Sequence, residues 1–284
     1  MGQYNLSRIL KPKSIAIIDS DSSTEAISRG VFSHLTNAGF AGSLYPILPA
    51  HSELRGQKAY KSLHDLEEVI DLAIITASIH SVPEIIDTCI ERKAGGTIIL
   101  SDRQHVNDKK YKGIAQTISQ KAYDGGLRIM GPNSLGVIQP GLGLNASLAP
   151  VMPNKGHLSF ISQSRAISAA VIDLALHEQF GFSHFIDIGA ALDVDLGDMI
   201  DYLGGDYSTK SILIYMNRLT HVRKFMSAAR AVSRIKPIIV LKAGTSHEDG
   251  PRASDSNKYT IDEEMIYDAL FKRAGIIRVD TVEA

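Results

Sequence analysis

The sequence predicts an α/β protein with two parallel sheets, each covered by helices. Short runs rich in Ile, Val and Leu alternate with longer helical patterns, and most of these runs are apolar at nearly every position. Strands of that kind are typical of parallel sheets buried on both faces. The alternation is interrupted once near the middle of the 284 residues, and a chain of this length is long enough for two domains.

The first half alternates expected strands and helices in order. Residues 13–18 form the first apolar run, and a helix is expected over 25–38 because Val31, Phe32 and Leu35 share one face. Gly39 directly follows this helix and is its expected C-terminal stop. The remaining strands are expected at 43–47, 71–76, 95–100 and 127–130, and the remaining helices at 82–89 and 106–123.

The second half repeats this alternation after a segment that differs in composition. Residues 140–156 are rich in Pro, Gly and Asn, which favours a connection between domains. We therefore expect one domain at 1–143 and another at 144–284. Strands are expected at 157–161, 184–188, 212–216, 237–242 and 276–279, and helices at 166–178, 196–203, 221–234 and 263–273.

Composition excludes several classes of function. A formal net charge of −1 gives no argument for binding nucleic acid or an anionic membrane. No signal peptide or long apolar run is present, so we expect a cytoplasmic protein that does not span a membrane. The single cysteine, Cys89, is expected to be a buried thiol in a reducing compartment.

The sequence predicts no metal site. The ten histidines form no metal-binding motif, and the acidic residues between 193 and 201 lack the spacing of a calcium loop. Asp198 and Asp201 are instead expected on a solvated helix face.

The turn after the first strand is where a parallel α/β domain would bind a phosphate. There is no glycine between Asp19 and Arg29, although glycine lets backbone amides approach a pyrophosphate closely. Acidic residues in the same turn would repel a phosphate. The alternative interpretation is a polar turn that caps the following helix.

Two further loops follow expected strands. Residues 131–136 either line a ligand crevice or form only a tight turn. Ser162, Gln163 and Ser164 open a helix, where an anion site with added charge from Arg165 is expected. Simple N-capping by Ser162 or Ser164 is the alternative.

Several strings, in order, carry a resemblance over nearly the whole chain. They are LKPKSIAII at 10–18, GPNSLG at 131–136, LNASLAPVMP at 144–153, FISQS at 160–164 and AGIIRVDT at 274–281. The chain resembles the ADP-forming acyl-CoA synthetases, which are relatives of the succinyl-CoA synthetase α subunit. The same pair of domains opens bacterial protein lysine acetyltransferases that end in a GNAT domain. The resemblance implies a Rossmann-like CoA-binding domain followed by a flavodoxin-like, succinyl-CoA ligase-like domain.

The resemblance also implies that catalytic positions are degenerate. In active members a histidine carries the phosphoryl group, and its position within the polar run 252–258 is Ser256 here. Serine has no nitrogen that can form a phosphoramidate. The glutamate that holds the phosphohistidine matches Asn217. His247, nine residues before Ser256, could substitute only if the loop were shifted.

Other departures concern coenzyme A. The glycines of the family's CoA loop fall on Asp19, Glu25 and Ser28, and the glycine after Ser-Gln-Ser falls on Arg165. If CoA still binds, the resemblance implies the following contact residues: Ser20, Ser22, Pro46, Gly131, Asn133 and Ser134.

These observations lead to one hypothesis and two alternatives. We expect a non-ligating module that senses acyl-CoA or regulates a protein acetyltransferase, with an ATP-grasp or GNAT domain in the same chain or as a partner. CoA or acetyl-CoA binding should be absent or weaker than ~100 μM. The first alternative is the α-type half of a working ligase with an ATP-grasp partner. The second is an assembly scaffold that forms a homo-oligomer through its second domain.

Overall fold

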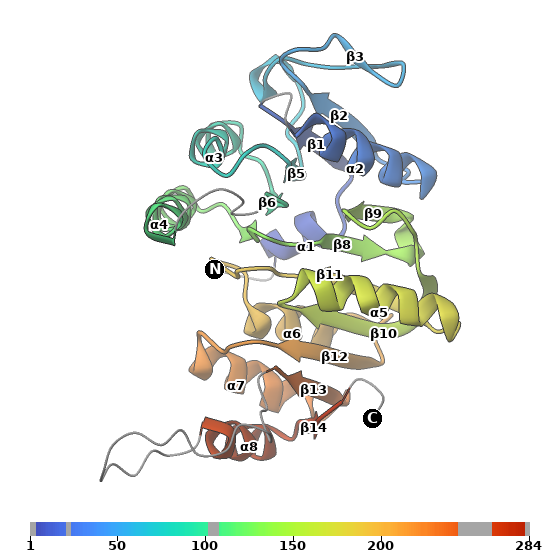
Figure 1. The fold of residues 1–284 in the computed structure, drawn as a ribbon, viewed down its shortest axis with the longest axis vertical. Helices are drawn as coiled ribbons and strands as arrows, with labels where there is room; N and C mark the ends of the chain where they lie inside the picture. The colour runs from blue at the N-terminus through green and yellow to red at the C-terminus, as the bar shows by residue number, and fades with distance from the viewer. Residues whose placement is uncertain (1–3, 21–23, 102–107, 244–262, 282–284) are drawn as a thin grey trace.

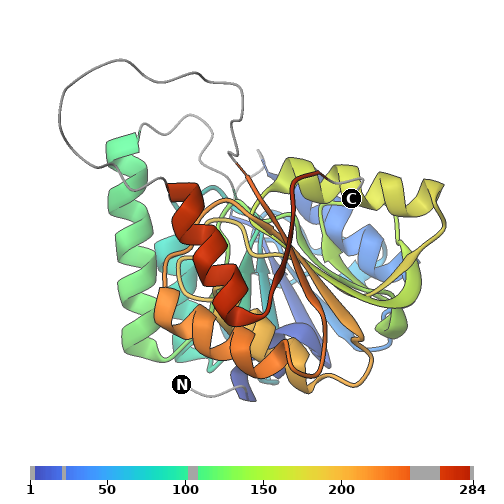
Figure 2. The same cartoon turned by 90° about the horizontal axis from the view of Figure 1, so that it is seen from below.

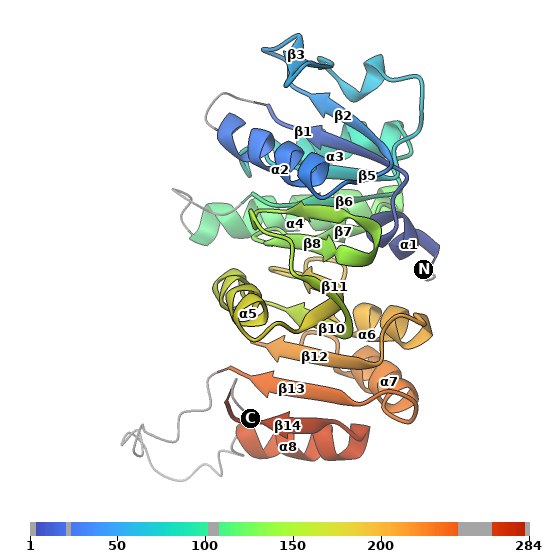
Figure 3. The same cartoon turned by 90° about the vertical axis from the view of Figure 1, so that its right-hand side faces the viewer.

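A computed structural model describes residues 4–20, 24–101, 108–243 and 263–281 of the chain, and it contains two main sheets in one elongated molecule (Figure 1). The strands succeed one another along the long axis from β2 at one end to β14 at the other (Figure 3). Helices lie on both sides of the sheets, as Figure 2 shows. The predicted α/β fold class is confirmed.

The first sheet is parallel throughout, with strand order β2-β1-β5-β6-β7. Its strands are β1 (Ser14–Ile18), β2 (Ser43–Ile47), β5 (Leu72–Ile75), β6 (Gly96–Ile99) and β7 (Ile129–Met130). The segments around it are α1 (Tyr4–Leu10), α2 (Glu25–Asn37), β3 (Glu53–Leu54), β4 (Gln57–Lys58), η1 (Leu63–Asp65), α3 (Val82–Glu91) and α4 (Asp108–Gly125). Gly39 has a φ of +75°, which confirms it as the residue that ends α2.

The second sheet has strand order β14-β13-β12-β10-β11-β8-β9. Its parallel strands are β10 (Asn154–Ser162), β11 (Gly181–Asp187), β12 (Ser211–Met216), β13 (Ile238–Lys242) and β14 (Ile277–Val279). Its helices are α5 (Arg165–His177), α6 (Leu196–Gly205), α7 (Val222–Val232) and α8 (Glu263–Ala274). These elements agree with the predicted ones to within a few residues.

The segment expected to connect the domains is partly a β-hairpin. β8 (Gly136–Gln139) and β9 (Leu144–Ser147) pair antiparallel, with the short helix η2 (Pro140–Leu142) between them. Gly143 closes the turn with a φ of +61°, which favours glycine. Because Pro, Gly and Asn are typical of both linkers and hairpin turns, composition alone did not distinguish the two.

This hairpin bears on the expected boundary at residue 143. β8 precedes that residue, yet it pairs antiparallel with β11 of the second sheet, with Ile186 opposite Val137. The division into 1–143 and 144–284 stays a prediction, and the sheet hydrogen bonding favours a start of the second unit near Gly136.

One apolar core runs through both sheets. Ile15 and Ile74 of the first sheet belong to the same buried cluster as Ile161 and Ile186 of the second. Arg128, just before β7, reaches across to the second unit, where its guanidinium lies 2.9 Å from both Asp193 and Asp198. The two units are therefore joined by continuous packing and by ion pairs.

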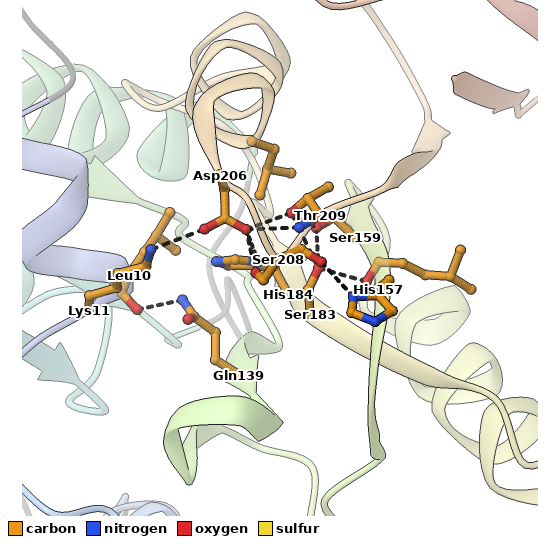
Figure 4. A network of polar contacts seen from close by, with 12 residues as sticks. Leu10, Lys11, Gln139, His157, Ser159, Ser183, His184, Asp206, Ser208 and Thr209 are labelled. Atoms are coloured by element: carbon orange, nitrogen blue, oxygen red, sulfur yellow. Dashed lines mark hydrogen bonds and ion pairs between the residues drawn. The ribbon is translucent and has the colours of Figure 1, made fainter. Parts of the chain in front are cut away.

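A second polar junction lies at the C-terminal end of α1, around Leu10 and Lys11 (Figure 4). Lys11 Nζ lies 3.0 Å from Asp206 Oδ1, and the Gln139 side chain donates a hydrogen bond to the Leu10 carbonyl. Burial alone would raise the pKa of Asp206, but hydrogen bonds led by those from Ser208 and Lys11 hold it well below its usual range. A charged Asp206 thus ties the first helix to the second unit.

Candidate functional site

The turn after β1 places a buried carboxylate at the N-terminus of α2. Asp19 is 3% exposed, and its Oδ2 accepts a hydrogen bond from Ser28 Oγ at 2.8 Å. Its Oδ1 accepts from the Ser20 backbone N–H at 2.8 Å and from the Thr24 hydroxyl. Because a helix N-terminus favours negative charge, the Asp19 carboxylate takes the electrostatic position that a phosphate would use.

Of the two CoA contacts expected in this turn, the structure describes only Ser20. Ser20 is exposed, and its N–H already serves Asp19. Ser22 lies outside the described residues. Thr24 is the N-cap residue of α2, but its side chain makes no capping bond to the helix. The Asp19 carboxylate accepts hydrogen bonds from the hydroxyl groups of Thr24 and Ser28, and capping of α2 by this turn stays a prediction.

A pocket of about 80 Å³ opens beside this turn and is lined by Asp19, Ser20, Glu25 and residues 48–51. Glu25 pairs with Arg29, and its Oε2 lies 3.2 Å from His51 Nε2. Two carboxylates thus line the pocket. A carboxylate ~4 Å from a phosphate charge is repelled by about 4 kcal/mol at an effective dielectric constant of ~20.

Pro46 was also expected to contact CoA. It is buried inside β2, where its carbonyl accepts the Tyr60 N–H at 2.9 Å. The pocket wall nearest to it is formed by the residues that follow the strand. The role of Pro46 toward CoA stays a prediction.

The loop at 131–136 lies where the two sheets meet. Gly131 has a φ of +100°, and a Cβ there would come within 2.4 Å of the Ile99 carbonyl oxygen. Asn133 is exposed with a φ of +58°, a conformation that Asn tolerates better than most residues. Ser134 is fully buried, donates to the Asp187 carbonyl and accepts the Gly136 N–H at 2.8 Å. Of the three, only Asn133 presents its side chain to solvent.

Asp187, which sequence reasoning missed, is the buried carboxylate next to this loop. Its Oδ2 accepts from Ser168 Oγ at 2.7 Å and its Oδ1 from the Gly189 N–H at 2.9 Å. Burial raises the pKa of Asp187 from 3.8 to about 6, and these hydrogen bonds together with the Arg165 charge limit the rise. A carboxyl group that titrates near neutrality is thereby buried at the carboxyl end of β11.

The Ser-Gln-Ser string opens α5 as predicted. Ser164 is the N-cap residue and accepts the Ile167 N–H at 3.4 Å, while Ser162 Oγ accepts the Ser164 N–H at 2.9 Å. N-capping is therefore confirmed. The Arg165 guanidinium donates to the Leu100 carbonyl at 2.9 Å, toward the first sheet. The anion site expected here stays a prediction.

Gln163 and Asn217 contact one another across two neighbouring strand ends. Gln163 Oε1 accepts the backbone N–H groups of Asn217 at 2.8 Å and Arg218 at 3.1 Å. The Asn217 side chain donates back to the Gln163 carbonyl at 3.1 Å. The run 252–258 with Ser256, and His247, lie outside the described residues.

A histidine that the sequence did not single out lies nearby. His221 Nδ1 is 2.8 Å from Asp195 Oδ2, and the two side chains are 61% and 6% exposed. Both residues line a small pocket together with Gln163 and Arg218. The carboxylate orients the imidazole through one ring nitrogen, and the contacts of the described residues leave the other nitrogen open to a ligand.

The acidic residues before and within α6 cap the helix and form ion pairs. Asp195 and Asp198 form a capping box at the start of the helix. Asp198 also contacts Arg128 at 2.9 Å and Lys224 at 2.6 Å, with 12% of its side chain exposed. The expectation that Asp198 lies on a solvated face was therefore wrong, whereas Asp201 is exposed as predicted.

Within the described ranges, no group of three or more metal-ligating side chains is close enough to hold a metal ion. Among the helices that the structure describes, none has the length and apolar character to cross a membrane.

Comparison with known families agrees with this geometry. Residues 13–140 match a family described as a CoA binding domain, and residues 155–284 match a succinyl-CoA ligase like flavodoxin domain. The chain therefore carries a CoA binding domain and a succinyl-CoA ligase like flavodoxin domain. Its CoA binding domain precedes its ligase-like domain, in the order that the sequence resemblance implied.

Individual relatives are longer than this chain. An acetate–CoA ligase (ADP-forming) of Methanocaldococcus jannaschii is 36% identical over 99% of this chain and 39% of its own length. The α subunit of acetate–CoA ligase (ADP-forming) I of Pyrococcus furiosus is 31% identical over 98% and 61%. The dinucleotide forming acetyl-coenzyme A synthetase 1 of Ca. Korarchaeum cryptofilum, solved with phosphate and ADP, superposes with a TM-score of 0.87 at 30% identity, covering 98% of this chain and 60% of that one.

Proposed function

We propose that this chain, with its CoA binding domain and its succinyl-CoA ligase like domain, is a non-ligating module that senses acyl-CoA or regulates a protein acetyltransferase. The contact between Gln163 and Asn217 is the observation that carries the proposal. In the family that this chain resembles, the residue matching position 217 is a glutamate, and its carboxylate holds the phosphohistidine. Asn217 has no negative charge for that task, and its amide is already engaged by the Gln163 carbonyl at 3.1 Å.

The same proposal includes a lowered affinity for coenzyme A. The CoA binding domain is present as a fold, and its first turn carries Asp19 where the family has glycine. That carboxylate is buried and held by Ser28, so it does not readily turn away from an incoming phosphate. Acetyl-CoA should therefore bind more weakly than ~100 μM.

The partner that we propose is an ATP-grasp or GNAT domain, in the same chain or separate, acting in the cytoplasm. One relative is itself named as an α subunit, which supports a partnership. The location is consistent with Cys89, a fully buried thiol whose pKa is raised by burial to about 12 and which is therefore inert.

Phosphoryl transfer tests the central claim. The chain is incubated with labelled ATP, acetyl-CoA and the β subunit that works with the Pyrococcus furiosus α subunit, and that α subunit serves as the positive control. We expect an acid-labile phosphoryl group on the α subunit and none on this chain. Labelling of this chain would contradict the non-ligating proposal, and calorimetry showing low-micromolar acetyl-CoA affinity would contradict its CoA component.

One observation favours the alternative function, the α-type half of a working ligase. His221 is oriented by Asp195 and lines the same small pocket as Gln163. In that role its Nε2 would attack the phosphorus of an acyl phosphate, and the bond from phosphorus to the acyl oxygen would break to release a carboxylate. The proton on Nδ1 would stay hydrogen-bonded to Asp195.

Replacement of His221 separates this alternative from the leading proposal. In the labelling assay above, the ligase alternative requires an acid-labile signal that His221→Asn removes. His177→Asn is the matched control, because the side chain of His177 is 84% exposed and lies outside this pocket. A signal that survives His221→Asn would exclude His221 as the carrier.

A further inference from the structure

The two sheets meet at the carboxyl ends of their strands. The loop after β7 lies between the ends of β6 and β11. Its Asn133 N–H donates to the Ser101 carbonyl, just after β6, at 2.8 Å. Its Pro132 carbonyl accepts the Ala190 N–H, just after β11, at 2.8 Å. Because parallel α/β sheets bind ligands outside the carboxyl ends of their strands, the ligand-binding edges of both sheets come together at this junction.

The Arg165 side chain crosses this junction. Arg165 is the first residue of α5, and its guanidinium donates to the Leu100 carbonyl, directly after β6, at 2.9 Å. Its charge also acts on the buried carboxyl group of Asp187, the last residue of β11, and lowers the pKa of that group against the larger effect of burial. The guanidinium therefore lies between strand ends of the first and the second sheet.

Acceptors on both units fix the direction of this side chain. The N-terminus of a helix carries partial positive charge and disfavours a cation, so an arginine at the first position of α5 gains nothing from the helix. The Leu100 carbonyl and the Asp187 carboxyl group supply the negative partial and full charges that offset this. The resemblance implies glycine at position 165, and glycine has no side chain that crosses the junction. The crossing is therefore a feature of this chain.

The junction lies within reach of CoA bound to the first sheet. The strand order of that sheet reverses between β1 and β5, which is where a parallel sheet binds its ligand. β6 is the second strand from β1, and neighbouring strands lie about 4.8 Å apart, so the end of β6 is about 10 Å from the end of β1. The pantetheine arm of CoA is longer than this when extended. A CoA molecule whose nucleotide lies at the first turn is therefore long enough to bring its thiol to the junction.

We propose that Arg165 is an autoinhibitory strut, whose guanidinium closes the junction between the two sheets and keeps the thiol arm of CoA out of it. The inference rests on the proposed CoA-sensing function and adds the means by which the site is closed. For the arm to enter, Arg165 must release the Leu100 carbonyl. The free energy of this charge-assisted hydrogen bond then opposes CoA binding.

Two measurements on Arg165→Met test the strut. This substitution removes the guanidinium and keeps the aliphatic part of the side chain. Amide hydrogen exchange at Asn133 and Ala190, which bond across the junction, should become about tenfold faster than in the parent. In calorimetry CoA should bind about tenfold more tightly. The adenosine bisphosphate that forms the nucleotide part of CoA should bind as it does to the parent, because it lacks the pantetheine arm.

Arg230→Met is the matched control. Arg230 is exposed on α7, a helix that packs against α6 and α8, so its loss should change neither the exchange at the junction nor CoA binding. Arg165→Gly is a second variant in case the methionine variant folds poorly. It installs the residue that the resemblance implies, and it should reproduce both effects.

The strut is overturned if either effect is missing from both Arg165 variants, or if the nucleotide part of CoA gains as much affinity as CoA itself. It is also overturned if Arg230→Met produces the same changes. Failure of the proposed function is seen separately, as low-micromolar binding of acetyl-CoA by the parent chain. The strut is judged by the ratio between variant and parent, and its exchange measurement needs no CoA.

Discussion

The side-chain oxygen of Gln163 accepts the backbone N–H of Asn217 at 2.8 Å, so that the residue at the end of β12 is held by the residue that opens the turn before α5. The contact is reciprocal, because the Asn217 amide donates to the Gln163 carbonyl. A carboxylate at position 217 would place negative charge beside that carbonyl oxygen instead. The pair therefore fixes two strand ends where the resemblance implied a phosphohistidine site.

We predict that Gln163→Met lowers the free energy of unfolding by about 1 kcal/mol, because the backbone N–H groups of Asn217 and Arg218 lose their shared acceptor. Gln163→Glu keeps two acceptor oxygens and should not lower it. Urea titrations of the three proteins measure the difference. Equal stability of the methionine variant and the parent would show that solvent replaces this acceptor without cost.

Asp19→Asn should improve CoA binding. The substitution removes the negative charge at the N-terminus of α2 and keeps the size of the side chain, so we expect at least about tenfold tighter binding in calorimetry. Asp65→Asn is the control, because Asp65 caps the short helix η1 and is not among the residues lining the pocket beside Asp19. An unchanged affinity in Asp19→Asn would mean that this carboxylate does not oppose CoA.

Asp187 should make the folded state less stable as pH rises. Its pKa is about 6 in the folded state against 3.8 for the ordinary group. Its contribution is therefore full below about pH 3.8 and is lost as pH rises through 6, by on the order of 3 kcal/mol. Asp187→Asn removes this dependence, so the stability of the variant relative to the parent should be higher at pH 7.5 than at pH 4 by roughly that amount. Denaturant titrations at both pH values measure this, and a difference independent of pH would contradict the prediction.

His184 should act in the opposite direction. Its ring is 1% exposed, no hydrogen-bond partner of either nitrogen is found in the described part of the chain, and burial lowers its pKa from 6.5 to about 4. Because the folded state binds this proton more weakly than the unfolded chain, His184 contributes stability that is fully present above pH 6.5. That contribution is lost as pH falls through 4. His184→Phe should reduce the loss of stability between pH 6.5 and pH 4, measured by the same titrations. A parent and variant with parallel pH profiles would contradict this.

Arg128→Ala should destabilise the chain by about 3 kcal/mol or more, because it leaves Asp193 and Asp198 without the buried guanidinium that contacts both. Arg8→Ala is the control. Its side chain is 37% exposed, pairs with Asp71 and donates a hydrogen bond to the Ile70 carbonyl, so its loss should cost only about 1 kcal/mol. Thermal and urea unfolding compare the two, and similar losses would show that the ion pairs of Arg128 are no stronger than those of a surface arginine.

The fold class and nearly all of the parallel strands could be predicted from the sequence, since each strand is a short apolar run bounded by turn residues. The hairpin of β8 and β9 could not, because its Pro and Gly residues are equally typical of a linker. The local sequence pattern also contains no signal for α1, which packs against β6.

The candidate site was less accessible to sequence reasoning. The acidic character of the first turn was visible, but the hydrogen bond from Ser28 that holds Asp19 depends on the geometry of α2. His221 and Asp195 lie on different segments and meet only because α6 and α7 pack side by side. The sequence around Asp187 has the pattern of an ordinary strand end, because no local sequence pattern reveals that neighbouring elements bury this side chain completely.

The close approach at Gly189 has a consequence for how such proteins diversify. A Cβ on Gly189 would come within 2.3 Å of the Pro132 carbonyl oxygen, so the loop after β11 presses directly, backbone against backbone, on the loop after β7. The shape of this junction is set by main-chain atoms from both halves. An exchange of only one half should therefore be tolerated only where the main-chain path of both loops is preserved.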